Sequence, residues 1–178
     1  AIRNVRLQPS NDLEQEQLRS ILGADFRVSP NLRFYGELGT GQVDNDRDET
    51  TANFQNAWSL QQLFVDVRGH SGRFLIGMMA GRQEFADGPR QLISLGDGPN
   101  LHRTWNGIRL YAHSTRARVG VFDLRATRLG RHGFDDGVAT SERLRGVNAS
   151  FMISPSAGQN TYLDPFWIRS ESHTLRLG

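Results

Sequence analysis

Apolar and polar residues alternate along most of this chain. In the segment 18–28, Leu, Ser, Leu, Ala, Phe and Val at even positions alternate with Arg, Ile, Gly, Asp and Arg at odd positions. A second alternating segment follows at 32–38, after the turn residues Ser-Pro-Asn. Successive side chains of a strand point to opposite faces, so this period of two predicts half-buried strands. The short gap between the two segments predicts a hairpin.

The same period continues through the rest of the chain. Further strands are expected at 62–68, 74–84, 103–113, 118–128 and 147–153. A change of parity between Val121 and Phe122 predicts a β-bulge there. An eighth strand is expected at 161–169, although Pro165 weakens it, and a ninth begins at Ser172.

Short and long connections alternate between these strands. Short turns are predicted at 29–31, 69–73, 114–117 and 154–159, and long loops at 39–57, 85–102 and 129–142. The strands run about 9–11 residues, which is the length of a tilted bilayer crossing. We therefore predict an all-β antiparallel meander, a partial transmembrane β-barrel of about eight or nine strands. A soluble β-sandwich or lipocalin-like barrel also alternates its faces and is the alternative.

Neighbouring strands are expected to pair in chain order. The short turns predict that 18–28 pairs with 32–40, 62–68 with 74–82, and 104–113 with 118–127. One face of these strands is apolar, and on a barrel it would meet lipid. Its members are Leu22, Phe26, Leu38, Val65, Val67, Ile108 and Leu110.

The composition limits the classes of function that the chain can have. The chain has 178 residues, no cysteine, 21 basic residues that are all arginine, and a formal charge of +2. The size fits a single domain, and the missing cysteines exclude disulfides and thiolate chemistry. The small net charge gives no argument for nucleic acid as a partner. No segment approaches the ~20 apolar residues of a membrane helix.

Charged residues gather on the second face of the predicted strands. It carries Arg33, Glu37, Asp66, Arg68, Arg103 and Arg109, with Tyr35, Phe64, Trp105 and Tyr111 among them. Rings of arginine in a pore select anions. Arg82 and Glu84 share a face, and form either a pair near a pore mouth or a simple surface salt bridge. A solvated face of a soluble sheet would also carry such charges.

No catalytic or metal-binding motif emerges. The segment Asp44–Glu49 resembles the start of a calcium loop, but its sixth position is Glu49 instead of Gly and its twelfth is Gln55 instead of Glu. The five histidines are scattered without ligand spacing. We therefore expect no enzyme activity, no cofactor and no metal, and leave calcium binding by the 44–49 loop open.

Several segments resemble one family. They are Leu-Gln-Gln-Leu-Phe-Val-Asp-Val-Arg at 60–68, Ala-Gly-Arg-Gln-Glu-Phe at 80–85 and Asp-Gly-Pro-Asn-Leu-His-Arg-Thr-Trp-Asn-Gly-Ile-Arg-Leu at 97–110. Over about residues 20–128 the chain is similar to the alginate-export family of Gram-negative outer-membrane porins. Trp105-Asn106-Gly107 stands where the family usually has Phe-Asp-Gly, so one carboxylate is missing.

The resemblance implies passive export of an anionic, alginate-like polysaccharide through an arginine-lined pore in the cell outer membrane. Its implied partners are outer-membrane lipid, the anionic polysaccharide or a small anion, and periplasmic secretion proteins, with no nucleic acid. The predicted pore-lining residues are Arg82, Arg103, Arg109, Glu84, Asp66, Arg33, Glu37 and Arg68. The alternatives are a porin for small anionic solutes and a soluble β-rich carbohydrate-binding module.

The family implies a wider barrel than the strands counted here. An eight-stranded barrel is filled by its own side chains, so a polysaccharide would not pass. We expect residues 1–178 to be a single domain, the N-terminal part of a longer barrel, with residues 1–17 as a periplasmic lead-in. The sequence leaves the substrate, the total strand number and the oligomeric state open.

Overall fold

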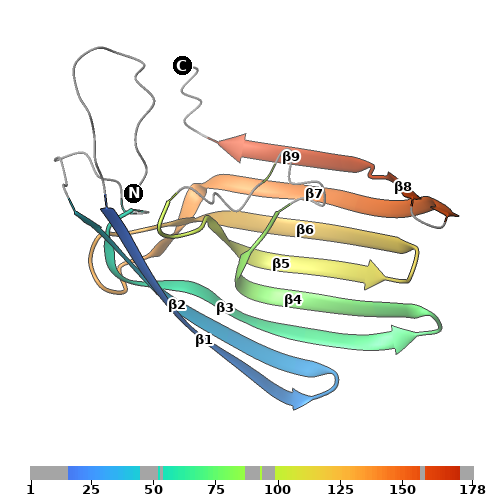
Figure 1. Ribbon diagram of the computed structural model, residues 1–178, viewed down its shortest axis with the longest axis horizontal. Helices are drawn as coiled ribbons and strands as arrows, with labels where there is room; N and C mark the ends of the chain where they lie inside the picture. The colour runs from blue at the N-terminus through green and yellow to red at the C-terminus, as the bar shows by residue number, and fades with distance from the viewer. Residues whose placement is uncertain are drawn as a thin grey trace, which may run out of the picture.

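The computed structural model describes residues 16–44, 52, 54–86, 93, 99–156 and 159–172. These residues form one antiparallel sheet in which the first eight strands lie side by side in chain order and the ninth pairs with the seventh (Figure 1). The strands are β1 (Glu16–Ser29), β2 (Leu32–Asp44), β3 (Asn56–Ser71), β4 (Phe74–Glu84), β5 (Thr104–His113), β6 (Ala117–Arg128), β7 (Gly137–Ser156), β8 (Gln159–Leu163) and β9 (Phe166–Ser172). The predicted all-β meander is thus confirmed. None of the described residues forms a helix long and apolar enough to cross a membrane.

The three predicted hairpins are also confirmed. Phe26 pairs with Phe34 in β1–β2, Val67 with Met78 in β3–β4, and Leu110 with Val121 in β5–β6. The tight turns of these hairpins gather at one end of the sheet and the longer connections at the other (Figure 1).

The bulge predicted between Val121 and Phe122 is wrong. The β5–β6 register runs unbroken through both residues, and the nearest irregularity lies between Arg125 and Thr127 in the β6–β7 pairing. Phe122 keeps the strand's parity but is buried against Phe85, with ring centroids 4.5 Å apart. The apolar residues Phe122, Leu124 and Ala126 lie on the polar face, and Asp123 and Arg125 on the apolar face, so the hydropathy pattern of this strand resembled a change of parity.

Strand ends differ from the predicted boundaries. β2 and β3 extend into the expected 39–57 loop, and β7 begins at Gly137, inside the expected 129–142 loop. Charged and polar side chains on an exposed face do not interrupt a hydrogen-bonded ladder, so hydropathy alone ends the strands too early. Residues 1–15 and 45–49, which hold most of the predicted lead-in and of the calcium-like segment, lie outside the described residues.

The predicted strand 161–169 is divided in two. β8 and β9 both pair with β7, through Phe151–Leu163 and Asn148–Phe166, and are separated by Asp164 and Pro165. Pro165 has no N–H to donate to the ladder. Its carbonyl oxygen accepts a hydrogen bond from the Ala149 N–H at 2.9 Å, so the interrupted strand stays against β7. Ser172 is the last residue of β9, and 173–178, which hold the rest of the strand expected to begin at Ser172, lie outside the described residues.

The register sorts the side chains onto two faces. The apolar face carries the seven residues predicted to share it: Leu22, Phe26, Leu38, Val65, Val67, Ile108 and Leu110. The opposite face, here called the polar face, carries Arg33, Glu37, Asp66, Arg68 and Arg109. Most large side chains of the apolar face are exposed, which marks it as a surface that something else covers.

The buried core lies on the polar face. Phe85 and Ile93, from the connection between β4 and β5, pack on Trp105, Phe122 and Leu124. Leu124 is fully buried. Phe85 and Ile93 of the β4–β5 connection therefore cover one part of the polar face.

Candidate functional site

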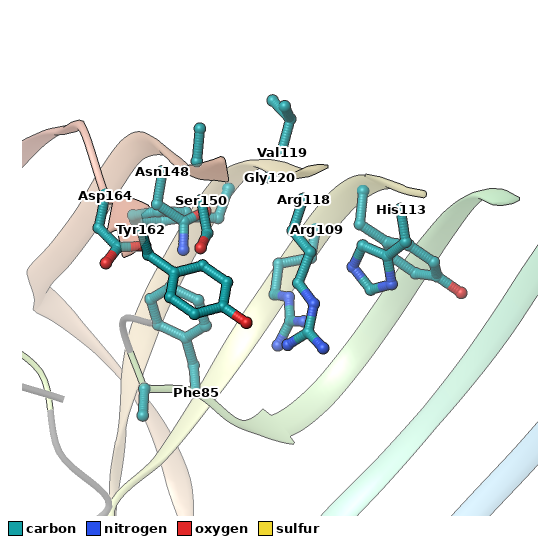
Figure 2. Close-up of a pocket in the computed structure, with 14 residues that line it drawn as sticks. Phe85, Arg109, His113, Arg118, Val119, Gly120, Asn148, Ser150, Tyr162 and Asp164 are labelled. Carbon is teal, nitrogen blue, oxygen red and sulfur yellow. The ribbon is translucent and has the colours of Figure 1, made fainter. Parts of the chain in front are cut away.

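A cavity of about 360 Å³ opens on the polar face beside the core. Its lining comes from β5, β6, β7 and β8 and from Phe85 in the β4–β5 connection. Figure 2 shows Arg109, Arg118, His113 and Tyr162 pointing to the same side of the sheet, with the Phe85 ring pointing toward them from the β4–β5 connection. Val119 points to the opposite side, as strand alternation requires (Figure 2).

Strand register sets the positions of these side chains. His113 pairs with Arg118, Tyr111 with Gly120, and Gly120 in turn with Asn148. A Cβ at Gly120 would lie 2.5 Å from the Asn148 Oδ1 atom, so the missing side chain lets Asn148 extend over β6. Gly77 has the same effect for Tyr111, because a Cβ there would lie 2.4 Å from the tyrosine ring. Glycines on neighbouring strands thus shape this part of the polar face.

Two guanidinium groups dominate the chemistry of the cavity. Arg109 on β5 and Arg118 on β6 both line the cavity. The Arg109 Cζ atom is 5.2 Å from the centroid of the Phe85 ring, a cation–π distance. Among the described residues, neither arginine forms an ion pair. Since Asp164 is the one carboxylate in the lining, the cavity carries an excess of positive charge.

Tyr111 links the cavity to a second charged region on β1–β3. Its hydroxyl donates a 2.6 Å hydrogen bond to Asp66 Oδ1, and Asp66 is only 3% exposed. Asp66 pairs in register with Arg33, whose Nε donates to Asp25 Oδ1 at 2.9 Å. The polar face therefore carries cations and carboxylates on β1, β2, β3 and β5.

Aromatic rings accompany the charges in this second region. The Arg33 Cζ atom lies 5.2 Å from the Tyr35 centroid and 5.5 Å from the Phe64 centroid. The Tyr35 hydroxyl donates to Glu37 Oε2 at 2.6 Å, and Gln62 Nε2 donates to the same oxygen at 3.3 Å. These bonds hold Glu37 and the aromatic rings in place beside Arg33.

The predicted pore-lining residues fall into two groups in the structure: five that lie on the polar face within the strands, and Arg82, Glu84 and Arg103, which lie near the ends of β4 and β5. Arg33, Glu37, Asp66, Arg68 and Arg109 lie on the polar face, but only Arg109 of these lines the cavity. Arg68 Nε donates to the Pro30 carbonyl oxygen at 3.4 Å, near the tight-turn end. The predicted set is therefore spread along the face and does not converge on one point.

Arg103 lies just before β5. Its Cζ atom is 4.6 Å from the Trp105 ring centroid, and its Nη2 lies 3.0 Å from Glu142 Oε2. Glu142 therefore already offsets the charge of Arg103.

Arg82 and Glu84 belong to separate networks. The Arg82 side chain is 9% exposed and donates to Asn106 Oδ1 at 3.0 Å and to the Leu60 carbonyl oxygen at 2.8 Å. It also lies 3.5 Å from Asp136 Oδ2. Glu84 Oε1 instead contacts His102 Nδ1 at 2.7 Å. Arg82 thus joins the ends of β3 and β5 to the β6–β7 connection.

Sequence reasoning missed several residues of the cavity. Arg118, His113, Asn148, Tyr162 and Asp164 line it, but none was in the predicted set. The signal for Arg118 was present, because unbroken parity in 118–128 places it on the face of Phe122 and Arg109. Tyr162 and Asp164 gave no signal, because they flank the break at Pro165.

One apolar face and one face of arginines, carboxylates and aromatic rings define a class: a β-sheet that separates lipid from a polar interior. A family model described as alginate export matches residues 2–132. The chain therefore belongs to the alginate export family, an outer-membrane family, and the resemblance seen in the sequence is confirmed. No curated protein and no solved structure matches the chain.

Proposed function

We propose that this chain forms part of the wall of a passive outer-membrane channel that exports an anionic, alginate-like polysaccharide. The polar face lines the lumen and the apolar face meets lipid. The Arg109–Arg118 cavity is the observation that carries the proposal, because it combines aromatic rings with two guanidinium groups that form no ion pair with any described residue. Family membership supports alginate as the class of substrate.

The chemistry of a polyuronate fits this cavity. Each uronate residue carries one carboxylate, and a guanidinium fork binds a carboxylate with two parallel hydrogen bonds. Phe85, Tyr111 and Tyr162 offer flat apolar surfaces against which a sugar ring can lie. Conduction requires binding that is strong enough for entry and weak enough for release. No bond of the polysaccharide is broken in this scheme.

Further arginines would extend the path beyond the cavity. We propose that Arg33, Arg68, Arg103 and Arg109 line the lumen, with Glu37 and Asp66 tuning the field, and we add Arg118. Arg82 and Glu84 support the wall through their contacts with Asn106 and His102. A series of separate weak sites lets a chain of uronates slide from one to the next.

Open edges support a larger barrel. Within the described part of the chain, β1 pairs only with β2, and the outer edge of β8 and β9 has no partner strand. Backbone N–H and C=O groups at a sheet edge cannot stay unsatisfied in lipid. We therefore propose that residues 1–178 are the N-terminal part of a barrel completed by further strands, since wide pores need about 16–18 strands.

A small-solute porin is the second candidate. The cavity volume of about 360 Å³ lies at the lower end of the range of about 300–1,000 Å³ for small-molecule sites. One small organic anion between Arg109 and Arg118 would fill it. A soluble carbohydrate-binding module is not supported, because the matching family is an outer-membrane family.

Single-channel recording of the intact protein in planar bilayers tests the proposal. We expect a polyuronate to block the current transiently. The concentration of uronate units needed for block should be lower for the polymer than for the monomeric uronate. A neutral polysaccharide of the same length is the control and is expected to block much less. Equal potency of polymer and monomer would favour the small-solute porin. Absence of block by both anions, with open channels present, would contradict the proposal.

A further inference from the structure

An arginine cluster lies on the apolar face of β6, β7 and β9, toward the ends that carry the long connections. It consists of Arg125, Arg143, Arg145 and Arg169 together with Asp123 and Glu171. Two rows cross the three strands: Asp123–Arg145–Arg169 and Arg125–Arg143–Glu171. The next row toward the tight turns is Val121–Val147–Trp167. The cluster therefore borders the apolar part of the same face directly.

The arginines outnumber the carboxylates. Arg143 Nε donates to Asp123 Oδ1 at 2.8 Å, and Arg169 Nε lies 3.0 Å from Glu171 Oε1. Arg145 also donates to Glu171. Arg125 forms no ion pair with any described residue. Four guanidinium groups with two carboxylates leave the cluster with a net charge of +2, and its side chains stay partly exposed.

Membrane physics restricts where this cluster can lie. Arginine on the lipid face is strongly unfavourable at the bilayer midplane and nearly neutral at the interface. Trp167, which is 61% exposed, occupies the adjacent row, and aromatic residues favour the membrane interface. The cluster thus lies at the depth of the lipid headgroups. Long connections of outer-membrane barrels are extracellular, which assigns the cluster to the outer leaflet.

We propose that this arginine cluster binds the phosphate groups of a phosphorylated outer-leaflet lipid. Guanidinium groups bind phosphate oxygens in a bidentate manner, and the net charge of +2 complements a phosphorylated headgroup. The Val121–Val147–Trp167 row would contact the acyl chains of the same lipid. The inference rests on the proposed membrane insertion but not on the proposed lumen.

Comparison of two lipids by native mass spectrometry tests the inference. The intact protein is inserted into vesicles that contain either a bisphosphorylated glucosamine-disaccharide lipid or its dephosphorylated form. We expect about tenfold tighter binding of the phosphorylated lipid, which falls as the salt concentration rises. Equal binding of the two lipids by the unmutated protein would overturn the inference.

Variants then locate the site. In R143Q/R145Q/R169Q we expect the preference for the phosphorylated lipid to disappear. The matched control, R27Q/R73Q/R116Q, removes three arginines at or near the tight turns and is expected to keep it. An unchanged preference in R143Q/R145Q/R169Q would overturn the inference. If that variant does not fold, the comparison of the two lipids on the unmutated protein still tests whether the phosphate groups are recognised.

Polyuronate block recorded on the same preparations separates the two proposals. The proposed channel predicts block in the unmutated protein whichever lipid is present. Loss of block together with a retained lipid preference would contradict the channel and leave the lipid site intact. Block by the polyuronate without any preference for the phosphorylated lipid would contradict the lipid site and leave the proposed channel intact.

Discussion

Tyr111 connects the cavity to the buried carboxylate of Asp66. Its ring lies over Gly77 and lines the cavity, while its hydroxyl reaches Asp66 Oδ1 at 2.6 Å. A buried carboxylate needs its hydrogen bonds, since an unsatisfied buried acceptor is unfavourable. One residue therefore shapes the cavity wall and stabilises a charge on β3.

The Tyr111→Phe variant removes this hydrogen bond and keeps the ring. We expect the free energy of unfolding to fall by about 1–3 kcal/mol, because Asp66 loses its donor while remaining buried. Urea titration of the protein folded in vesicles measures the change. Tyr162→Phe is the control, because no hydrogen bond of its hydroxyl is seen among the described residues. Equal unfolding midpoints of Tyr111→Phe and the unmutated protein would contradict this role.

Parity along the strands was enough to place Asp66, Arg109 and Tyr111 on one face from the sequence. It could not show which of them touch, because residues 66 and 111 meet across the intervening strand β4. Arg118 was missing from the predicted pore-lining residues for a different reason. Phe122 is apolar and buried on the polar face, so its strand was interpreted as changing face.

The pairing of β4 with β3 and of β5 with β6 depends on two facing glycines. Gly81 pairs with Gly107, and both have positive φ, 128° and 155°. A Cβ at Gly81 would lie 2.2 Å from the Leu63 carbonyl oxygen, and one at Gly107 would lie 2.1 Å from the Asp123 carbonyl oxygen. Only glycine allows this conformation and this close approach of neighbouring strands.

The Gly81→Ala variant tests this requirement. We expect destabilisation by about 1–3 kcal/mol or more, because the substitution adds backbone strain and a clash. Gly36→Ala is the matched control, since a Cβ there would meet only Leu63 Cδ1 at 3.8 Å. Heat-induced unfolding of the two variants, followed by circular dichroism, gives the comparison. Equal transition temperatures would show that β3 and β4 tolerate a side chain at Gly81.

The apolar face provides a second test at the level of strands. Val65 lies in the centre of β3 on this face, between Phe34 and Ala80 in register. We expect Val65→Arg to destabilise the inserted protein by about 2–4 kcal/mol if the residue lies near the bilayer midplane. His70→Arg, on the other face of the same strand, is the control. Urea titration in vesicles that shows no difference between them would contradict a lipid-facing role for Val65.

Strands and hairpins followed from the period of two, but the connections did not. The sequence predicted 85–102 only as a long loop and gave no contact for it, whereas Phe85 and Ile93 pack on the polar face. Both residues pack against Trp105, Phe122 and Leu124. Where a strand has apolar residues on both faces, its hydropathy shows no period of two, so this packing surface could not be recognised from the sequence. The break at Pro165 was foreseeable from its missing N–H, but the pairing of both halves with β7 was not.

At the scale of the whole molecule, the sheet separates two environments. Large apolar side chains cover one face, and arginines with carboxylates and aromatic rings cover the other. Arg109 and Arg118 line a cavity of the polar face and form no ion pair with any described residue, whereas Arg103 is paired with Glu142. Anion selectivity should therefore depend more on Arg109 and Arg118 than on Arg103.

Reversal potential in a salt gradient across a planar bilayer tests this claim most directly. The intact protein is compared with R109Q/R118Q and with R73Q/R116Q, which removes two arginines from the tight turns. We expect the ratio of anion to cation permeability to fall in R109Q/R118Q and to stay near the unmutated value in R73Q/R116Q, because only the first pair lies in the proposed lumen. If R109Q/R118Q keeps the permeability ratio of the unmutated protein, these arginines do not line the conducting path, and the proposed channel is contradicted.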